Sequence, residues 1–171
     1  VGTYKTIEDM IIAEEVDCGF MSGTMRKELK FVPLCVDRML ALVPPKLLPS
    51  GCKSLPLEAI SDIDFIIPGE GSNYDIGRIL RTAGVRPRVK YSVSDDYAAV
   101  AMAEGGLGMT IVPELILKGI GGNRAAVELE PACTRTIGIA ERSIGTGSPA
   151  CAAFMRFTEN WVKRHSEDAI Q

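Results

Sequence analysis

Apolar runs of strand length alternate with helix-like segments through the middle of the chain. Three predicted strands, residues 64–67, 87–93 and 108–113, alternate with two predicted helices, residues 74–84 and 95–106. Gly84 is expected to end the first helix, and Ser94 or Asp95 to cap the second. Because strands that alternate with helices form parallel or mixed sheets, this order predicts an α/β fold with helices on both faces of the sheet.

The chain before this region continues the same alternation. Thr6 is expected to cap a short helix with an apolar face, and residues 16–21 follow as a buried strand. The apolar run at residues 31–45 is predicted to be a strand that breaks at residues 34–37, because Pro33 lacks a backbone N–H.

The end of the chain is predicted to be two strands and a helix. The strand-like pieces are residues 126–131 and 135–142. Ser148 is expected to cap the helix, with Pro149 at its first position. The predicted apolar face of this helix consists of Cys151, Phe154, Met155, Thr158, Trp161 and Val162.

Composition and charge exclude several functions. The formal net charge is −3, and the basic residues form no long run, so the chain has no electrostatic footprint for nucleic acid. No apolar stretch approaches the roughly 18 residues of a transmembrane helix, and the first residues do not resemble a secretory signal. The five cysteines include no C-x-x-C pair, which indicates reduced thiols in a cytoplasm and no zinc or other metal site.

The residues needed for catalysis are missing from the predicted fold. The single histidine, His165, falls in the polar tail, so a nucleophile would have no imidazole base. Cys18 falls in an apolar strand and Cys151 on an apolar helix face, which is typical of inert packing thiols. We therefore expect no enzyme and no cofactor.

Five stretches resemble, in order, the effector-binding domain of LysR-type bacterial transcriptional regulators. They are residues 7–20, 31–45, 65–73, 89–117 and 148–162. The resemblance implies a two-lobed, periplasmic-binding-protein-like fold, each lobe a mixed sheet flanked by helices, joined by two crossover strands. Lobe one would comprise residues 1–36 plus 136–171, lobe two residues 37–135, and the effector would lie in the cleft between them.

Two parts of the family pattern have no counterpart in these residues. One is the N-terminal winged helix-turn-helix that binds DNA, and the other is the strand and helix that begin the sensing domain. We therefore expect a fragment of a regulator that is cut inside lobe one.

Candidate binding residues lie at predicted helix starts and strand ends. The loop 69–73 offers backbone N–H groups and a helix dipole to an anion, although a plain turn is the alternative. Thr3 and Tyr4 precede a helix, and Met21 and Ser22 follow a strand, with capping and a turn as the alternatives. The candidate effector-binding residues are therefore Thr3, Tyr4, Met21, Ser22, Gly69, Gly71, Ser72 and Asn73. Asp95 and Asp96 would repel an anion, which favours structural roles for them.

The predicted function is to sense a small polar or anionic metabolite in the cytoplasm. The resemblance implies that DNA is reached only through the missing N-terminal domain, that no membrane is involved, and that sensing domains form homodimers, with a dimer or tetramer for the full-length regulator. The alternative is a periplasmic-type solute-binding protein of a transporter, which would have the same fold. A winged helix ahead of this chain would support the first, and a signal peptide the second.

Overall fold

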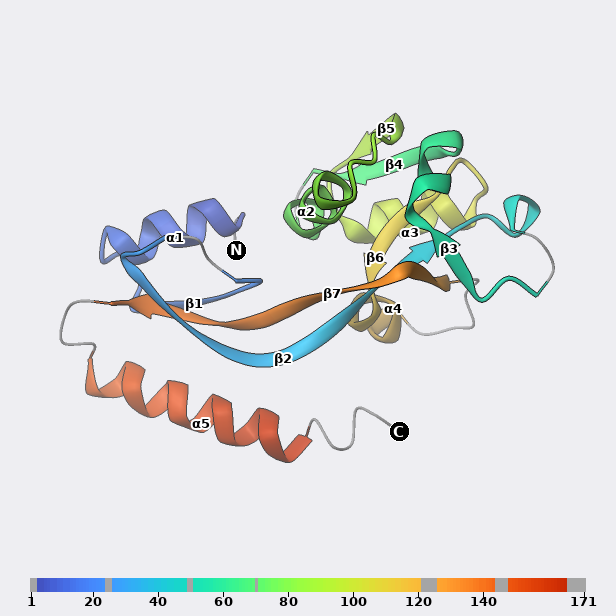
Figure 1. Ribbon diagram of the computed structural model, residues 1–171. Helices are drawn as coiled ribbons and strands as arrows, with labels where there is room; N and C mark the ends of the chain where they lie inside the picture. The colour runs from blue at the N-terminus through green and yellow to red at the C-terminus, as the bar shows by residue number, and fades with distance from the viewer. Residues whose placement is uncertain are drawn as a thin grey trace. The chain divides into compact units, whose positions relative to one another are not determined.

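The computed structural model describes residues 3–23, 26–48, 51–69, 71–120, 126–143 and 148–165. Its elements are α1 (Tyr4–Ile12), β1 (Cys18–Met21), β2 (Leu29–Leu42), η1 (Pro45–Leu47), β3 (Ser54–Pro56), η2 (Leu57–Asp62), β4 (Asp64–Pro68), α2 (Asn73–Ala83), β5 (Arg88–Val93), α3 (Asp96–Glu104), β6 (Thr110–Pro113), α4 (Glu114–Ile120), β7 (Ala126–Arg142) and α5 (Pro149–His165). Figure 1 labels the α-helices and the strands. The chain forms two compact units. Unit 1 holds residues 1–36 and 135–171, and unit 2 holds residues 37–134.

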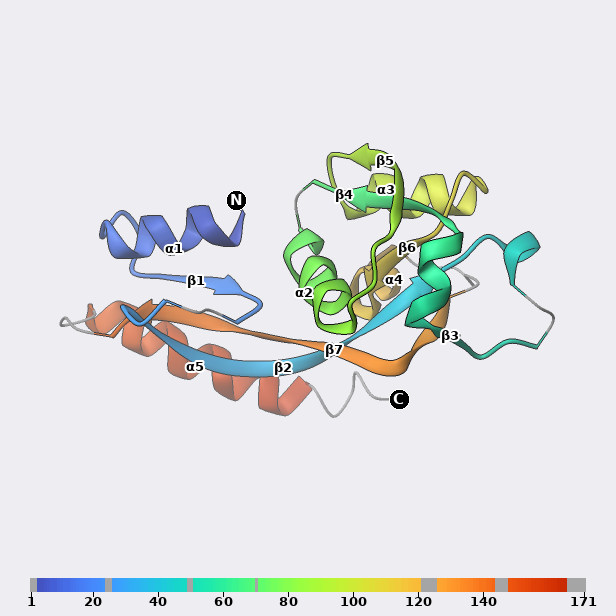
Figure 2. The ribbon, with the colours of Figure 1, turned by 45° about the horizontal axis from the view of Figure 1, so that its top comes forward.

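In unit 1, helices cover both faces of a sheet. β1 pairs antiparallel with β7, from Cys18 opposite Glu141 to Met21 opposite Gly138. Ala140 of β7 packs in the cluster that includes residues of α1, whereas Ile139 packs with residues of α5. Because consecutive strand residues point to opposite faces, α1 and α5 lie on opposite sides of the sheet, as Figures 1 and 2 show.

Unit 2 contains two groups of strands. β6 pairs antiparallel with residues 39–42 of β2, and β3 pairs parallel with residues 128–130 of β7. β4 and β5 form a separate parallel pair. Two hydrogen bonds of 2.8 Å, from the Ile66 N–H to the Met109 carbonyl and from the Met109 N–H to the Asp64 carbonyl, attach β4 to the segment before β6.

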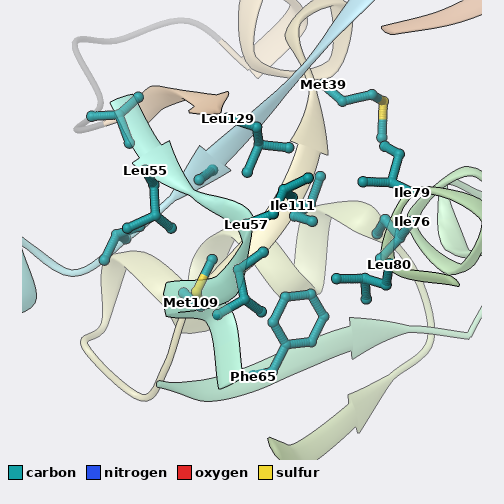
Figure 3. Packing of buried hydrophobic residues seen from close by; sticks show 14 residues of the cluster. Met39, Leu55, Leu57, Phe65, Ile76, Ile79, Leu80, Met109, Ile111 and Leu129 are labelled. Carbon is teal, nitrogen blue, oxygen red and sulfur yellow. The ribbon is translucent and has the colours of Figure 1, made fainter. Parts of the chain in front are cut away.

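The core of unit 2 forms on both sides of β4. Phe65, which is fully buried, packs in the larger cluster with Ile76, Ile79 and Leu80 of α2 (Figure 3). These three positions have the i, i+3, i+4 spacing of one helix face. The next residue, Ile66, packs in the second cluster, to which α3 contributes. The helices α2 and α3 therefore cover opposite faces of β4, and both start at the same end of the β4–β5 pair.

Most predicted elements are present, including α2 with its left-handed cap at Gly84 (φ 70°). The predicted break in the second strand is wrong, because β2 runs continuously past Pro33. β6 pairs only with residues 39–42, which leaves one edge of β2 without a described ladder partner at Pro33, and unpaired strand edges tolerate proline. The two predicted strands at the end are one strand, β7, and the segment before β4 forms the short strand β3 followed by the 3₁₀ helix η2.

Two helix predictions also need correction. Thr3, not Thr6, caps α1: its side chain accepts a hydrogen bond from the Thr6 N–H at 3.2 Å. In α5, Ser148 does cap the helix, since its hydroxyl accepts from the Cys151 N–H at 3.1 Å. However, only part of the predicted apolar face is buried, and Phe154 and Trp161 are 46% and 48% exposed. The apolar stripe is wider than the strip that contacts the sheet.

Candidate functional site

The loops after β4 and β5 meet at the carboxyl end of the parallel pair. The loop after β4 leads into α2, and the loop after β5 leads into α3. The Gly69 N–H donates to the Val93 carbonyl at 2.6 Å and joins the two loops. Ligands of open α/β sheets bind at such carboxyl ends, where helix N-termini present backbone N–H groups.

A buried serine–aspartate pair links the starts of α2 and α3. Ser72, 0% exposed, donates its backbone N–H to Asp96 Oδ2 at 3.2 Å and its hydroxyl to Asp96 Oδ1. Asp96 is itself only 8% exposed, in the first turn of α3. Gly71 has φ 74°, and a Cβ there would collide with this carboxylate, so both backbone shape and space require glycine. The negative charge that the start of α2 favours is therefore supplied by the chain itself.

Asp95 has the capping role that the sequence predicts. Its carboxylate accepts from the Ala98 N–H at 2.9 Å and from the Ser94 hydroxyl at 3.0 Å. The pKa of Asp95 lies below its ordinary value, first because of the Ala98 N–H and then because of the Ser94 hydroxyl. It is therefore ionised at neutral pH and anchors the start of α3.

Asn73 has a different position from Ser72. It is half-buried, and its Nδ2 donates only a long hydrogen bond of 3.4 Å to the Gly69 carbonyl. The first hydrogen bond of the helix runs from the Ile76 N–H to the Ser72 carbonyl at 2.9 Å, so the helix itself does not use the Asn73 N–H. Asn73 thus offers a side-chain amide and a backbone donor at the start of α2.

The remaining candidate residues lie in unit 1. Thr3 caps α1, while Tyr4 and Met21 belong to one apolar cluster beneath that helix. Ser22 is buried directly after β1. The structure therefore brings Tyr4 and Met21 together within unit 1 and gathers the loop-69 residues within unit 2, with Glu70 outside the described residues.

Sequence reasoning missed the pairing of Asp96 with Ser72. Asp96 is expected from the sequence to have a structural role, because its carboxylate would repel an anionic ligand. The available signal was topological: both residues follow consecutive strands at equivalent positions, and parallel strands bring such positions together.

The described part of the chain contains no group of three or more His, Cys, Asp or Glu side chains arranged to hold a metal ion. The described helices also include none that is long and apolar enough to span a bilayer. His165 stacks on Trp161 of α5, with the two ring centroids 4.2 Å apart.

These features define an α/β module in which polar loops gather at the carboxyl ends of the parallel strands β4 and β5. The chain belongs to the LysR substrate binding domain family, whose model matches residues 1–163. This membership favours a regulator domain over the transporter alternative. A search of curated protein sequences finds no match.

Solved structures of the family have the same fold. The effector-binding domain of QuiR in complex with shikimate aligns with a TM-score of 0.77 at 21% identity, covering 96% of this chain and 80% of that one. The regulatory domain of Synechocystis PCC6803 CcmR in complex with 2-PG aligns at 0.82 and 17%, covering 95% and 81%. Full-length BenM E226K aligns at 0.79 and 18%, and the match spans 97% of this chain and 57% of that protein.

Proposed function

We propose that this chain is the sensing module of a transcriptional regulator and binds a small polar or anionic effector. The candidate effector-binding residues of unit 2 are Gly69, Gly71, Ser72 and Asn73, and those of unit 1 are Thr3, Tyr4, Met21 and Ser22. The observation that carries the proposal is that two loops meet at the carboxyl ends of β4 and β5. Hydrogen bonds from Gly69 and Ser72 join these loops. The shikimate and 2-PG complexes of the neighbouring structures support it.

The buried Asp96 carboxylate limits the charge of the effector. It already accepts from the N–H and the hydroxyl of Ser72, so an incoming anion meets a negative charge at the start of α2. Asn73, which can both donate and accept, suits a hydroxyl or a single carboxylate. We therefore favour a polar or singly charged effector over a multiply charged one.

The proposed module binds its effector and catalyses no reaction on it. It acts in the cytoplasm, as one half of a homodimer, and passes ligand occupancy to a DNA-binding domain in the complete regulator. A regulator needs only a difference in effector affinity between two conformations, so no general base or nucleophile is required.

Thermal unfolding with added metabolites tests the proposal. The probes are shikimate, 2-PG and a panel of small hydroxy acids. A ligand that binds only the folded chain stabilises it by about 2.7 kcal/mol at a concentration 100-fold above Kd, so at least one probe should raise Tm in a saturable way.

The variant Asn73→Ala should reduce this shift, because the ligand loses a side-chain partner. Asn160→Ala on α5 is the matched control and should respond like the unmodified chain. If no probe raises Tm, or if Asn73→Ala responds as strongly as Asn160→Ala, the proposed site is wrong.

A further inference from the structure

Unit 2 also contains a cavity, which lies along the half of α2 farthest from Ser72. Its volume is about 400 Å³, and its walls are η2, residues 78–83 of α2 and residues 131–134 of β7. Small-molecule pockets have volumes of roughly 300–1,000 Å³, so this space suits a small ligand. Since a helix rises about 1.5 Å per residue, Arg78 and Ala83 lie roughly 9 and 16 Å along α2 from Ser72.

Arg78 is the cation in the wall of this cavity. Its Nη2 donates to the Thr134 carbonyl at 3.1 Å and lies 3.6 Å from Asp75 Oδ1. These are its two polar partners among the described residues. Because a guanidinium has five N–H donors, several remain for a ligand, and their planar arrangement matches a carboxylate.

The other walls determine what kind of carboxylate fits. Leu57 and Ile79, both buried in the core, present an apolar floor. Glu58, an exposed residue of η2, adds a negative charge to the wall and makes no ion pair with a described residue. A second anionic group on the ligand would therefore be repelled, whereas an apolar body would gain contact with the floor.

Cys133 places a chemical reporter in the same space. It is half-buried, and its thiol lies 3.3 Å from the Pro131 carbonyl, to which it donates. Burial raises the pKa of this thiol, and the charge of Arg78 partly opposes the rise. Arg78 and Cys133 line the same cavity.

We propose that this cavity is a second small-molecule site, which takes a small monocarboxylic acid with an apolar body. The carboxylate pairs with Arg78, and the body packs on Leu57 and Ile79. The carboxylate uses guanidinium donors that the Thr134 carbonyl and Asp75 leave available.

Protection of Cys133 from alkylation tests the site directly. The full 171-residue chain is treated with iodoacetamide, and labelling of each cysteine is followed by peptide mass spectrometry with increasing benzoate. Benzamide is the neutral isostere. For a fragment of this size we expect a Kd of about 1 mM. Benzoate should slow Cys133 labelling at least about threefold at saturation, a modest factor because the occupant shields rather than seals the thiol. Labelling of Cys52 should not change.

Three variants decide whether the cavity is responsible. Arg78→Gln should weaken protection by benzoate at least about tenfold, the loss expected for a charge-assisted hydrogen bond, while Arg81→Gln on the same helix should not. Thr82→Trp, at an exposed helix position, should fill the cavity and slow Cys133 labelling without ligand. For each variant, the labelling rate of Cys133 with benzoate is divided by its rate without benzoate, because Arg78→Gln also alters the reactivity of the thiol itself.

The proposal is overturned by three results. These are no saturable protection in the millimolar range, equal protection by benzamide, or protection that survives Arg78→Gln. Because Cys133 and Arg78 line this cavity and not the loop at Ser72, none of these results depends on whether an effector binds near Ser72. Circular dichroism spectra and thermal melts confirm that each variant is folded.

Discussion

At the residue scale, the Ser72–Asp96 pair explains how the candidate loop keeps its shape. Two short polar side chains, buried together, replace the water that would otherwise solvate the start of α2. A buried carboxylate destabilises the folded state unless its charge is compensated. Here two donors of Ser72 and the dipoles at the N-termini of two helices stabilise the charge. The pair is therefore expected to be strongly coupled.

A double-mutant cycle measures that coupling. Asp96→Ala should lower the free energy of unfolding by about 1–3 kcal/mol, because the buried donors of Ser72 lose their acceptor. Ser72→Ala should cost less in the Asp96→Ala background than in the unmodified chain, with a coupling energy of about 0.5–3 kcal/mol. Urea denaturation followed by circular dichroism gives all four free energies. Additive losses would show that the two side chains act independently.

The sequence predicted where the candidate loop lies but not what occupies it. Glycine and serine between a strand and a helix are sufficient to locate a turn with free backbone donors. The acceptor of those donors is 24 residues further along the chain. Only the pairing of β4 with β5 brings it into contact, and local pattern does not specify such a long-range partner.

At the element scale, charged side chains attach α4 to two strands of unit 2. Arg38 of β2 donates to Glu114 Oε1 and Oε2 at 2.7 and 3.0 Å, and to Glu128 of β7 at 2.7 Å. The pKa of Glu114 lies below its ordinary value near 4.5, chiefly because of the hydrogen bonds from Arg38. A paired and bidentate guanidinium is a more favourable geometry than an isolated surface ion pair.

This network predicts acid sensitivity with a definite sign. The folded chain holds Glu114 ionised at a pH where the unfolded chain has begun to protonate it, so the stabilisation is complete above about pH 4.5 and is lost as the pH falls through the folded pKa. Glu114→Gln should cost about 0.5–1 kcal/mol at neutral pH, and the cost should shrink in acid. Urea titrations from pH 7 to pH 3 measure it.

Glu15→Gln is the control for net charge, because Glu15 is exposed and makes no ion pair with a described residue. It should leave the pH dependence unchanged. If the free energy of unfolding that Glu114→Gln loses stays constant with pH, the contact is not electrostatic.

The close pairing of β2 and β7 in unit 1 depends on a glycine. A Cβ at Gly138 would collide with the Val32 carbonyl and lie 2.7 Å from a carbon of the Phe31 ring. Gly138→Ala should therefore destabilise the chain by about 1–3 kcal/mol, as overpacking does. Gly119 of α4 has open space around it, so Gly119→Ala should instead stabilise the chain by up to about 1 kcal/mol. Denaturation midpoints with opposite signs are expected, and equal effects would contradict this packing.

Element types were predictable because they depend on period and on local breakers. Gly84 ends α2 and Asp95 caps α3 as expected from their residue types. The failures concern information from outside the segment. Pro33 breaks a strand only if its missing N–H faces a partner, and the exposed aromatic residues of α5 depend on how wide a strip of the helix the sheet covers.

At the scale of the whole molecule, the chain corresponds to one domain of longer members of its family. The family model matches residues 1–163, and the chain spans only 57% of full-length BenM E226K. Tyr97 of α3 is 60% exposed, and the resemblance to the regulator family implies that this helix lies at a subunit contact. Symmetric dimers are the commonest soluble oligomers, and we predict from the family resemblance that α1 and α3 form the contact.

Self-association provides the last test. We expect the chain to dimerise at micromolar concentration in sedimentation velocity, with Tyr97 at the contact, because buried tyrosines contribute strongly to interfaces. Tyr97→Glu should weaken the dimer at least about tenfold by removing an apolar contact and introducing a charge. Phe157→Glu is the matched control, since Phe157 of α5 is 62% exposed and lies outside the predicted interface. If Phe157→Glu dissociates the dimer and Tyr97→Glu does not, the subunits meet through α5. A carboxylate weakens the dimer only where the aromatic side chain that it replaces is buried on association.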